Sequence, residues 1–81
     1  MEREKLIAAV ADHLKTVGHG FVFEVVEGGV RQEEEWWYVP VVTQSSAGAT
    51  PPREFVINVF ANVEDQLEQE LGVNVLLIPA A

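Results

Sequence analysis

This 81-residue chain contains two histidines, a residue type that could support base or nucleophile chemistry. His13 lies at the edge of an apolar helical stripe, and His19 lies between two glycines in a helix-to-strand turn. Proton abstraction or nucleophilic attack needs a partner side chain within hydrogen-bond reach. The chain has no cysteine, and its Ser45-Ser46 pair falls in a loop pattern. We therefore interpret both histidines as boundary or turn residues and expect no catalytic residue.

The densest group of charges is the run Glu33, Glu34 and Glu35. Paired carboxylates can share acid and base roles or bind a hard cation. In an extended strand, Glu33 and Glu35 point to one face and Glu34 to the other, so the three cannot converge. Depending on register, Glu24 faces Glu33 or Glu35, and like charges opposite one another are unfavourable. A cation or a basic partner would relieve that conflict. We favour a splayed, solvated hairpin end and expect no metal site.

The glycines do not match a phosphate-binding loop. A dinucleotide fingerprint needs G-x-G-x-x-G ahead of a helix, and a P-loop ends in Gly-Lys-Ser/Thr. The segment Gly18-His19-Gly20 leads instead into a strand pattern and lacks the lysine. We therefore expect no cofactor.

The charge balance is strongly acidic, with 13 Asp and Glu against 5 Lys and Arg, a formal net charge of −8. Nucleic-acid binding depends on clustered Lys and Arg, and here the basic residues are scattered, so we expect no nucleic-acid partner. The acidity serves solubility or, alternatively, attraction to a basic partner. No apolar run approaches the ~20 residues that span a bilayer, and the mixed-charge start at 1–5 does not resemble a secretory signal. We expect no membrane association and a cytoplasmic location.

The first half of the chain predicts a helix followed by a hairpin. Residues 3–17 place their apolar side chains on one arc of a helical wheel. Residues 21–27 are rich in β-branched and aromatic types, which is typical of a strand. The pair Gly28-Gly29 predicts a tight turn, because both residues accept a positive φ. A second strand is expected within residues 30–43.

The end of this second strand carries two signals. Pro40 cannot donate to a β-ladder, so it places the strand at a sheet edge or at a bulge. Residues 44–52 have the Gly, Ser, Thr and Pro content of an exposed and mobile loop.

The segment that follows has two possible structures. Residues 55–60 favour a strand by propensity alone. From Phe55 to Leu71, however, the apolar residues share an arc of ~160° on a helical wheel, which a strand would not produce. We predict one helix over 52–71. A strand over 54–60 followed by a shorter helix is the alternative.

The last element is a short apolar run over 73–78, which predicts a buried strand. The chain 1–81 is thus expected to form a single small α+β domain in the order α-β-β-α-β. Its three-stranded sheet, a hairpin plus the C-terminal strand, carries both helices on one face. A domain this small, without disulfides, is often reinforced by oligomerisation.

Two helices cover only one face of such a sheet, so the other face needs an explanation. With the turn at Gly28-Gly29, the aromatic face falls beneath the helices and holds Phe21, Phe23, Val25, Trp36, Tyr38 and Val42. The opposite face then holds Val22, Val26, Trp37, Val39 and Val41, mixed with Glu24, Glu33 and Glu35. Apolar patches rimmed by charge are typical of interaction sites. The predicted interface consists of Val22, Trp37, Val39 and Val41, with Glu24 and Glu35 at its acidic rim.

The sequence therefore favours a non-enzymatic protein-interaction module, either a homodimer or a domain that docks a different protein partner through the open sheet face. One variant is a small acidic chaperone or antidote. The alternative is a small enzyme or ligand-binding domain with a site between the turn at 18–20 and the loop 44–52. A concave pocket there, with His19 facing a carboxylate, would favour this alternative.

Overall fold

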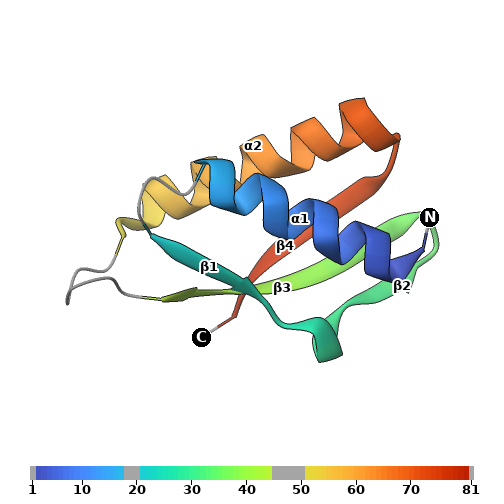
Figure 1. Cartoon of the computed structure of the whole chain (residues 1–81), viewed down its shortest axis with the longest axis horizontal. Coiled ribbons are helices and arrows are strands. Elements are labelled where there is room, and N and C mark those ends of the chain that lie inside the picture. The colour runs from blue at the N-terminus through green and yellow to red at the C-terminus, as the bar shows by residue number, and fades with distance from the viewer. Residues whose placement is uncertain (1, 18–20, 45–50, 81) are drawn as a thin grey trace.

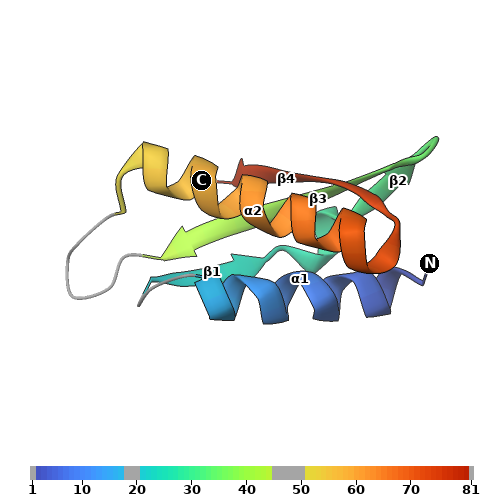
Figure 2. The same cartoon turned by 90° about the horizontal axis from the view of Figure 1, so that it is seen from above.

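The computed structural model describes residues 2–17, 21–44 and 51–80. Its elements are helix α1 (Arg3–Val17), strand β1 (Val22–Val25), the 3-10 helix η1 (Glu27–Gly29), strands β2 (Arg31–Glu33) and β3 (Trp36–Gln44), helix α2 (Arg53–Leu71) and strand β4 (Asn74–Ala80). Both helices lie on the same side of the sheet (Figures 1 and 2). The predicted α+β class, with its helices on one face, is confirmed.

Strand β3 is the centre of the sheet. Strand β4 runs parallel to it, pairing along Trp36–Val42. Strands β1 and β2 both run antiparallel to β3, β1 along Val41–Gln44 and β2 along Trp36–Tyr38. Because β4 occupies the opposite side of β3, β1 and β2 share one side and form a single line broken by η1. The sheet therefore has four strands in three lines. The predicted count of three strands is wrong, because the segment 30–43, predicted as one strand, contains β2 and most of β3.

The break in the β1–β2 line lies beside Pro40. The N–H of Val26 donates to the Pro40 carbonyl, 2.9 Å away, so the ring nitrogen of Pro40, which has no proton to donate, faces the same line. A Cβ at Gly29 would lie 2.8 Å from Pro40 Cγ. Glycine is required at this position because the backbone approaches the proline ring closely. The edge position predicted for Pro40 is wrong, because β3 is the central strand. In place of the alternative, a bulge at Pro40, the partner line is interrupted at η1 while β3 continues through Pro40.

The hairpin turn is not at Gly28-Gly29, which lies in η1, but at Glu34 and Glu35 between β2 and β3. Glu34 has a φ of 56°, the left-handed geometry that a tight turn requires. The glycine pair was misleading because glycine permits a close backbone approach as well as a turn.

Moving the turn exchanges the two faces of β3, because a slip of one residue sends each of its side chains to the other side. The residues of β1 keep their predicted faces. The observed register pairs Val25 with Val41 and Phe23 with Thr43. Val39 and Val41 are fully buried and Trp37 is 7% exposed, so all three belong to the core beneath the helices. Their predicted place on the open face is wrong, as is the predicted burial of Trp36, Tyr38 and Val42 in the core.

The helices fill this core from the positions that the helical wheels predict. Helix α1 contributes three buried residues and α2 contributes four: Leu6, Val10, Leu14, Val59, Phe60, Val63 and Leu67. The Phe60 ring meets Phe23 on β1 edge to face, with centroids 6.0 Å apart. Helix α2 is continuous through residues 54–60, which confirms the single helix and excludes the strand alternative. It ends at Gly72, with a φ of 67° and an N–H that donates to the Glu68 carbonyl.

Candidate functional site

The open face of the sheet is the side away from the two helices, and no described segment covers it. Its side chains follow from the register, since directly paired residues point to the same side. Trp36, Tyr38, Pro40 and Val42 from β3 form its central line. The flanking side chains are Val22, Glu24, Arg31, Glu33, Gln44, Asn74, Leu76, Ile78 and Ala80. The central line and these flanking residues together are called the open face.

Large apolar groups are unusually accessible on this face. Val22 is 52% exposed, Trp36 45% and Leu76 42%. Tyr38, Pro40, Val42 and Ile78 are half-buried in the same surface. These seven residues are contiguous across three lines of one sheet, and exposed apolar patches of this kind mark interaction surfaces. The apolar open face expected from the sequence is present, but most of its residues are those of the opposite parity.

The charged groups of the open face lie along the β1–β2 side. The Arg31 guanidinium lies over the Tyr38 ring, 5.3 Å from its centroid. Glu24 accepts a hydrogen bond of 2.7 Å from the Gln44 amide. With Glu33, these groups leave the face with a formal charge of −1 in a chain of −8. Most of the acidity therefore lies elsewhere, above all on α2, whose charged residues sum to −4.

The structure separates the six residues predicted as an interface. Val22 and Glu24 lie on the open face, and Glu35 is an exposed turn residue. Trp37, Val39 and Val41 are in the core. The sequence analysis missed Trp36, Tyr38 and Leu76. In β3 and β4 the odd-numbered and the even-numbered residues are largely apolar, so the pattern does not show which set is buried. Two signals favoured the observed side: a tyrosine hydroxyl and a proline are both better tolerated on a wetted face.

The anticipated conflict among the hairpin glutamates does not arise. Glu24 pairs across from Val42 and Glu33 across from Trp36. Both glutamates lie along the β1–β2 line, so neither faces the other. In the described ranges no group of three His, Cys, Asp or Glu side chains is placed to hold a metal ion.

The free edge of β4 is protected by a side chain from α2. Glu64 Oε2 accepts a hydrogen bond of 2.8 Å from the backbone N–H of Leu77. This N–H points away from β3, and so does position 79, where Pro79 has no donor. Burial raises the pKa of the Glu64 carboxyl, and the Leu77 hydrogen bond opposes that rise. A carboxylate and a proline thus block two of the outward positions at which another strand could pair.

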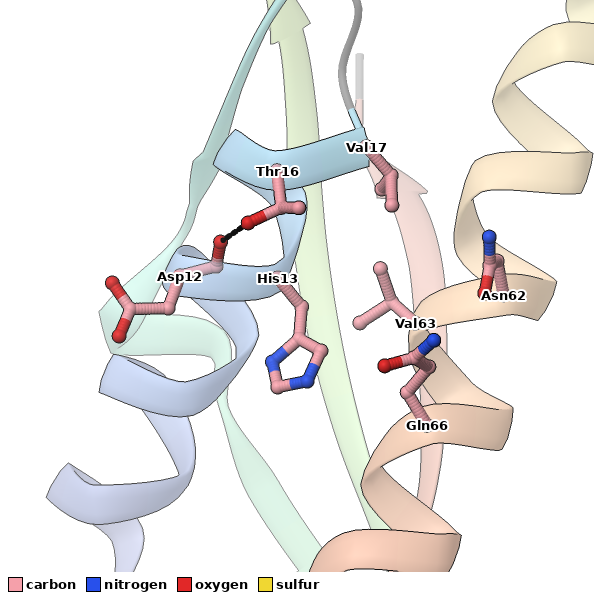
Figure 3. Close-up of a pocket in the computed structure, with 7 residues that line it drawn as sticks. All are labelled: Asp12, His13, Thr16, Val17, Asn62, Val63 and Gln66. Atoms are coloured by element: carbon pink, nitrogen blue, oxygen red, sulfur yellow. Dashed lines mark hydrogen bonds between the residues drawn. The ribbon is translucent and has the colours of Figure 1, made fainter.

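Several polar side chains line a groove between the two helices. The groove has a volume of about 280 Å³ and is lined by Asp12, His13, Thr16, Val17, Asn62, Val63 and Gln66. Figure 3 shows the His13 ring directed between the helices, toward the α2 side chains. Thr16 Oγ1 donates back to the Asp12 carbonyl, 3.1 Å away, as the dashed line shows.

Both nitrogens of His13 are engaged in this groove. Nδ1 lies 2.8 Å from the Ala9 carbonyl oxygen, and Nε2 lies 2.6 Å from Glu70 Oε2. Two acceptors require two ring protons, so the arrangement favours the imidazolium. The Ala9 carbonyl raises the pKa of His13 most; burial opposes this, and Glu70 adds to the rise. Through these two contacts His13 joins the end of α2 to α1. His19 lies outside the described residues.

The described helices include none that is both long enough and apolar enough to cross a membrane. No protein family, curated protein or solved structure matches this chain.

Proposed function

We propose that this protein is a non-enzymatic interaction module that binds a folded protein surface through its open face. The observation that carries the proposal is the exposure of Val22, Trp36 and Leu76 on one side of one sheet. Burying apolar area contributes about 25 cal/mol per Å², so such a surface gains free energy when a partner covers it. A tryptophan there is typical of interface centres.

The distribution of charge supports this choice of surface. The open face has a formal charge of −1, whereas the solvent side of α2 carries Glu54, Asp65, Glu68 and Glu70. Interface centres are depleted in charged residues relative to the remaining surface. The open face fits that composition, and the surface of α2 does not.

A location in the cytoplasm is part of this proposal. The chain contains no cysteine, and small domains of oxidising compartments usually rely on disulfides. The alternative, an enzyme or ligand site between residues 18–20 and 44–52, falls mostly outside the described residues.

A photo-crosslinking amino acid tests the proposal when it replaces Trp36 in one variant and Ile57 in another. Ile57 is the matched control, because it is 53% exposed but lies on α2, away from the open face. We expect protein adducts from position 36 in cells of the native host, and few from position 57. These adducts should disappear when Leu76→Glu is added. Equal yields from the two positions, or no adduct from position 36, would refute the proposed function.

A further inference from the structure

The geometry points to a second copy of this chain as the occupant of the open face. We infer a homodimer packed sheet against sheet about a twofold axis that passes over Pro40. This inference rests on the proposed function, since it names the partner of the same surface.

The side chains of the open face form rows that are symmetric about Pro40. One row contains Arg31, Tyr38 and Leu76, and another contains Glu24, Val42 and Ala80. Pro40 and Ile78 form the row between them. Each step between rows is two residues along β3, or about 7 Å. The basic row and the acidic row are therefore equally far from Pro40, in opposite directions.

A twofold axis lying in the interface and perpendicular to the strands reverses the order of the rows. It leaves the β1–β2 side over the β1–β2 side of the other copy. Arg31 and Glu24 both lie on that side. Arg31 therefore meets Glu24 of the partner subunit, and the symmetry repeats the contact, because in a twofold interface each pairing occurs twice.

Under the same operation, the apolar groups of the three rows around the axis match. Tyr38 lies over Val42 of the partner subunit, and Leu76 lies over Ala80 of the partner subunit. The central row of Pro40 and Ile78 packs against its own copy. The outer rows place Trp36 over Gln44 of the partner subunit and Val22 over Glu33 of the partner subunit, so these two apolar side chains lie at the ends of the interface. The interface thus has an apolar centre with two ion pairs at its rim, the arrangement typical of protein interfaces.

Long-range electrostatics permit this dimer despite the net charge of −8. The surfaces that meet carry a formal charge of −1 each, and α2, with −4, lies on the far side of each sheet. Packed sheets are separated by about 10 Å, so the two copies of α2 are farther apart than the Debye length of ~10 Å at 0.1 M salt. A contact between the helical layers would instead oppose two acidic surfaces at close range.

The sheet edges offer a poorer route to self-association. At the β4 edge, Glu64 occupies the N–H of Leu77, and Pro79 has none. The other edge consists of two short strands, four and three residues long, separated by η1. Short, interrupted and proline-containing edges resist strand addition. The open face is the remaining extended surface in the described part of the chain.

Charge-swap variants test this arrangement by sedimentation velocity. Arg31→Glu places two acidic groups at each rim contact, and Glu24→Arg places two basic groups there. We expect each single variant to weaken dimerisation by at least about tenfold, a change equivalent to ~1.4 kcal/mol. The double variant Arg31→Glu/Glu24→Arg should return to within about threefold of wild type, since both pairs are restored in reverse. A mixture of the two single variants should form a heterodimer.

The control variant for Glu24→Arg is Glu54→Arg, which makes the same change of charge on α2 and should not weaken the dimer. Circular dichroism confirms that each variant is folded. The twofold arrangement would be overturned if the single swaps left the dimer dissociation constant unchanged. It would also be overturned if the double variant did not restore dimerisation. A monomeric wild type would overturn the homodimer. In that case, crosslinks from position 36 to a different protein would still support the proposed function, so the two failures are distinguishable.

Discussion

Glu64 and Leu77 join the middle of helix α2 to the free edge of strand β4 through a hydrogen bond of 2.8 Å between a carboxylate oxygen and a backbone N–H. The carboxylate is partly buried, and burial raises its pKa. The protein thus places an ionisable group where a strand edge would otherwise be open. Because a neutral acceptor could satisfy the same N–H, the contribution of the charge and that of the hydrogen bond can be separated.

Replacing Glu64 tests this separation. Glu64→Gln keeps an acceptor for the Leu77 N–H and removes the cost of a partly buried charge, so we expect the free energy of unfolding to change by less than about 0.5 kcal/mol. Glu64→Ala leaves the N–H without its acceptor and should cost about 1 kcal/mol. Urea unfolding at neutral pH measures both changes. An alanine variant as stable as the glutamine variant would contradict the role of the hydrogen bond.

The neighbouring residues Trp36 and Trp37 should respond very differently to truncation. Trp37 is 7% exposed in the core, and Trp37→Ala should cost about 3–5 kcal/mol because it leaves a cavity. Trp36 is 45% exposed, and Trp36→Ala should cost about 1 kcal/mol or less in the monomer. Denaturant unfolding at a protein concentration below any dimer dissociation constant checks this. A larger loss of stability from Trp36→Ala than from Trp37→Ala would instead support the sequence prediction, in which Trp36 is in the core and Trp37 on the open face.

Gly29 should not tolerate a side chain, whereas Gly28 should. A Cβ at position 29 would lie 2.8 Å from Pro40 Cγ, and one at position 28 would meet nothing within 4 Å. Gly29→Ala should therefore cost about 1–3 kcal/mol through overpacking. Gly28→Ala should be neutral or stabilise by up to about 1 kcal/mol, because it restricts the unfolded chain. Melting temperatures of the two variants provide the comparison, and equal values would contradict the close approach at Pro40.

The His13–Glu70 contact should make stability depend on pH. The folded pKa of His13 is raised above 6.5, chiefly by the Ala9 carbonyl. A raised folded pKa means that this stabilisation is fully present below the unfolded pKa and is lost as pH rises through the folded value. The carboxylates acting on His13 are Glu70 on α2 and Asp12 on α1.

His13→Gln removes this titration, so the stability difference between wild type and variant should shrink as pH rises. Its full size is expected to be about 0.5 kcal/mol, as for other accessible ion pairs. Urea unfolding on both sides of the transition measures the difference, and Glu70→Gln should reduce it. A difference that is constant with pH, or an NMR pKa for His13 below 6.5, would contradict the contact.

The sequence predicted the helices well because their patterns are long and redundant. Between Phe55 and Leu71 the apolar stripe extends over several turns, which outweighed the strand propensity of 55–60. The sheet register rested on much less information. It depended on the position of a single turn. The pair Gly28-Gly29 is as compatible with a hairpin turn as with its observed place in η1.

These sequence patterns could not predict contacts between residues that are far apart in the chain. Nothing near His13 in the sequence indicates Glu70, and nothing near Leu77 indicates Glu64, because the first pair forms where α2 packs on α1 and the second where α2 packs on the sheet. The existence of an apolar open face could be predicted, since two helices cover one side of a sheet. Which residues belong to it required the register.

Trp36 and Trp37 are adjacent in the chain but point to opposite sides of β3. The two indoles therefore give the protein a built-in pair of optical reporters. The emission of Trp37 follows the integrity of the interior, and the accessibility of Trp36 to a soluble quencher follows the occupancy of the sheet surface. One unlabelled sample can thus distinguish unfolding from association.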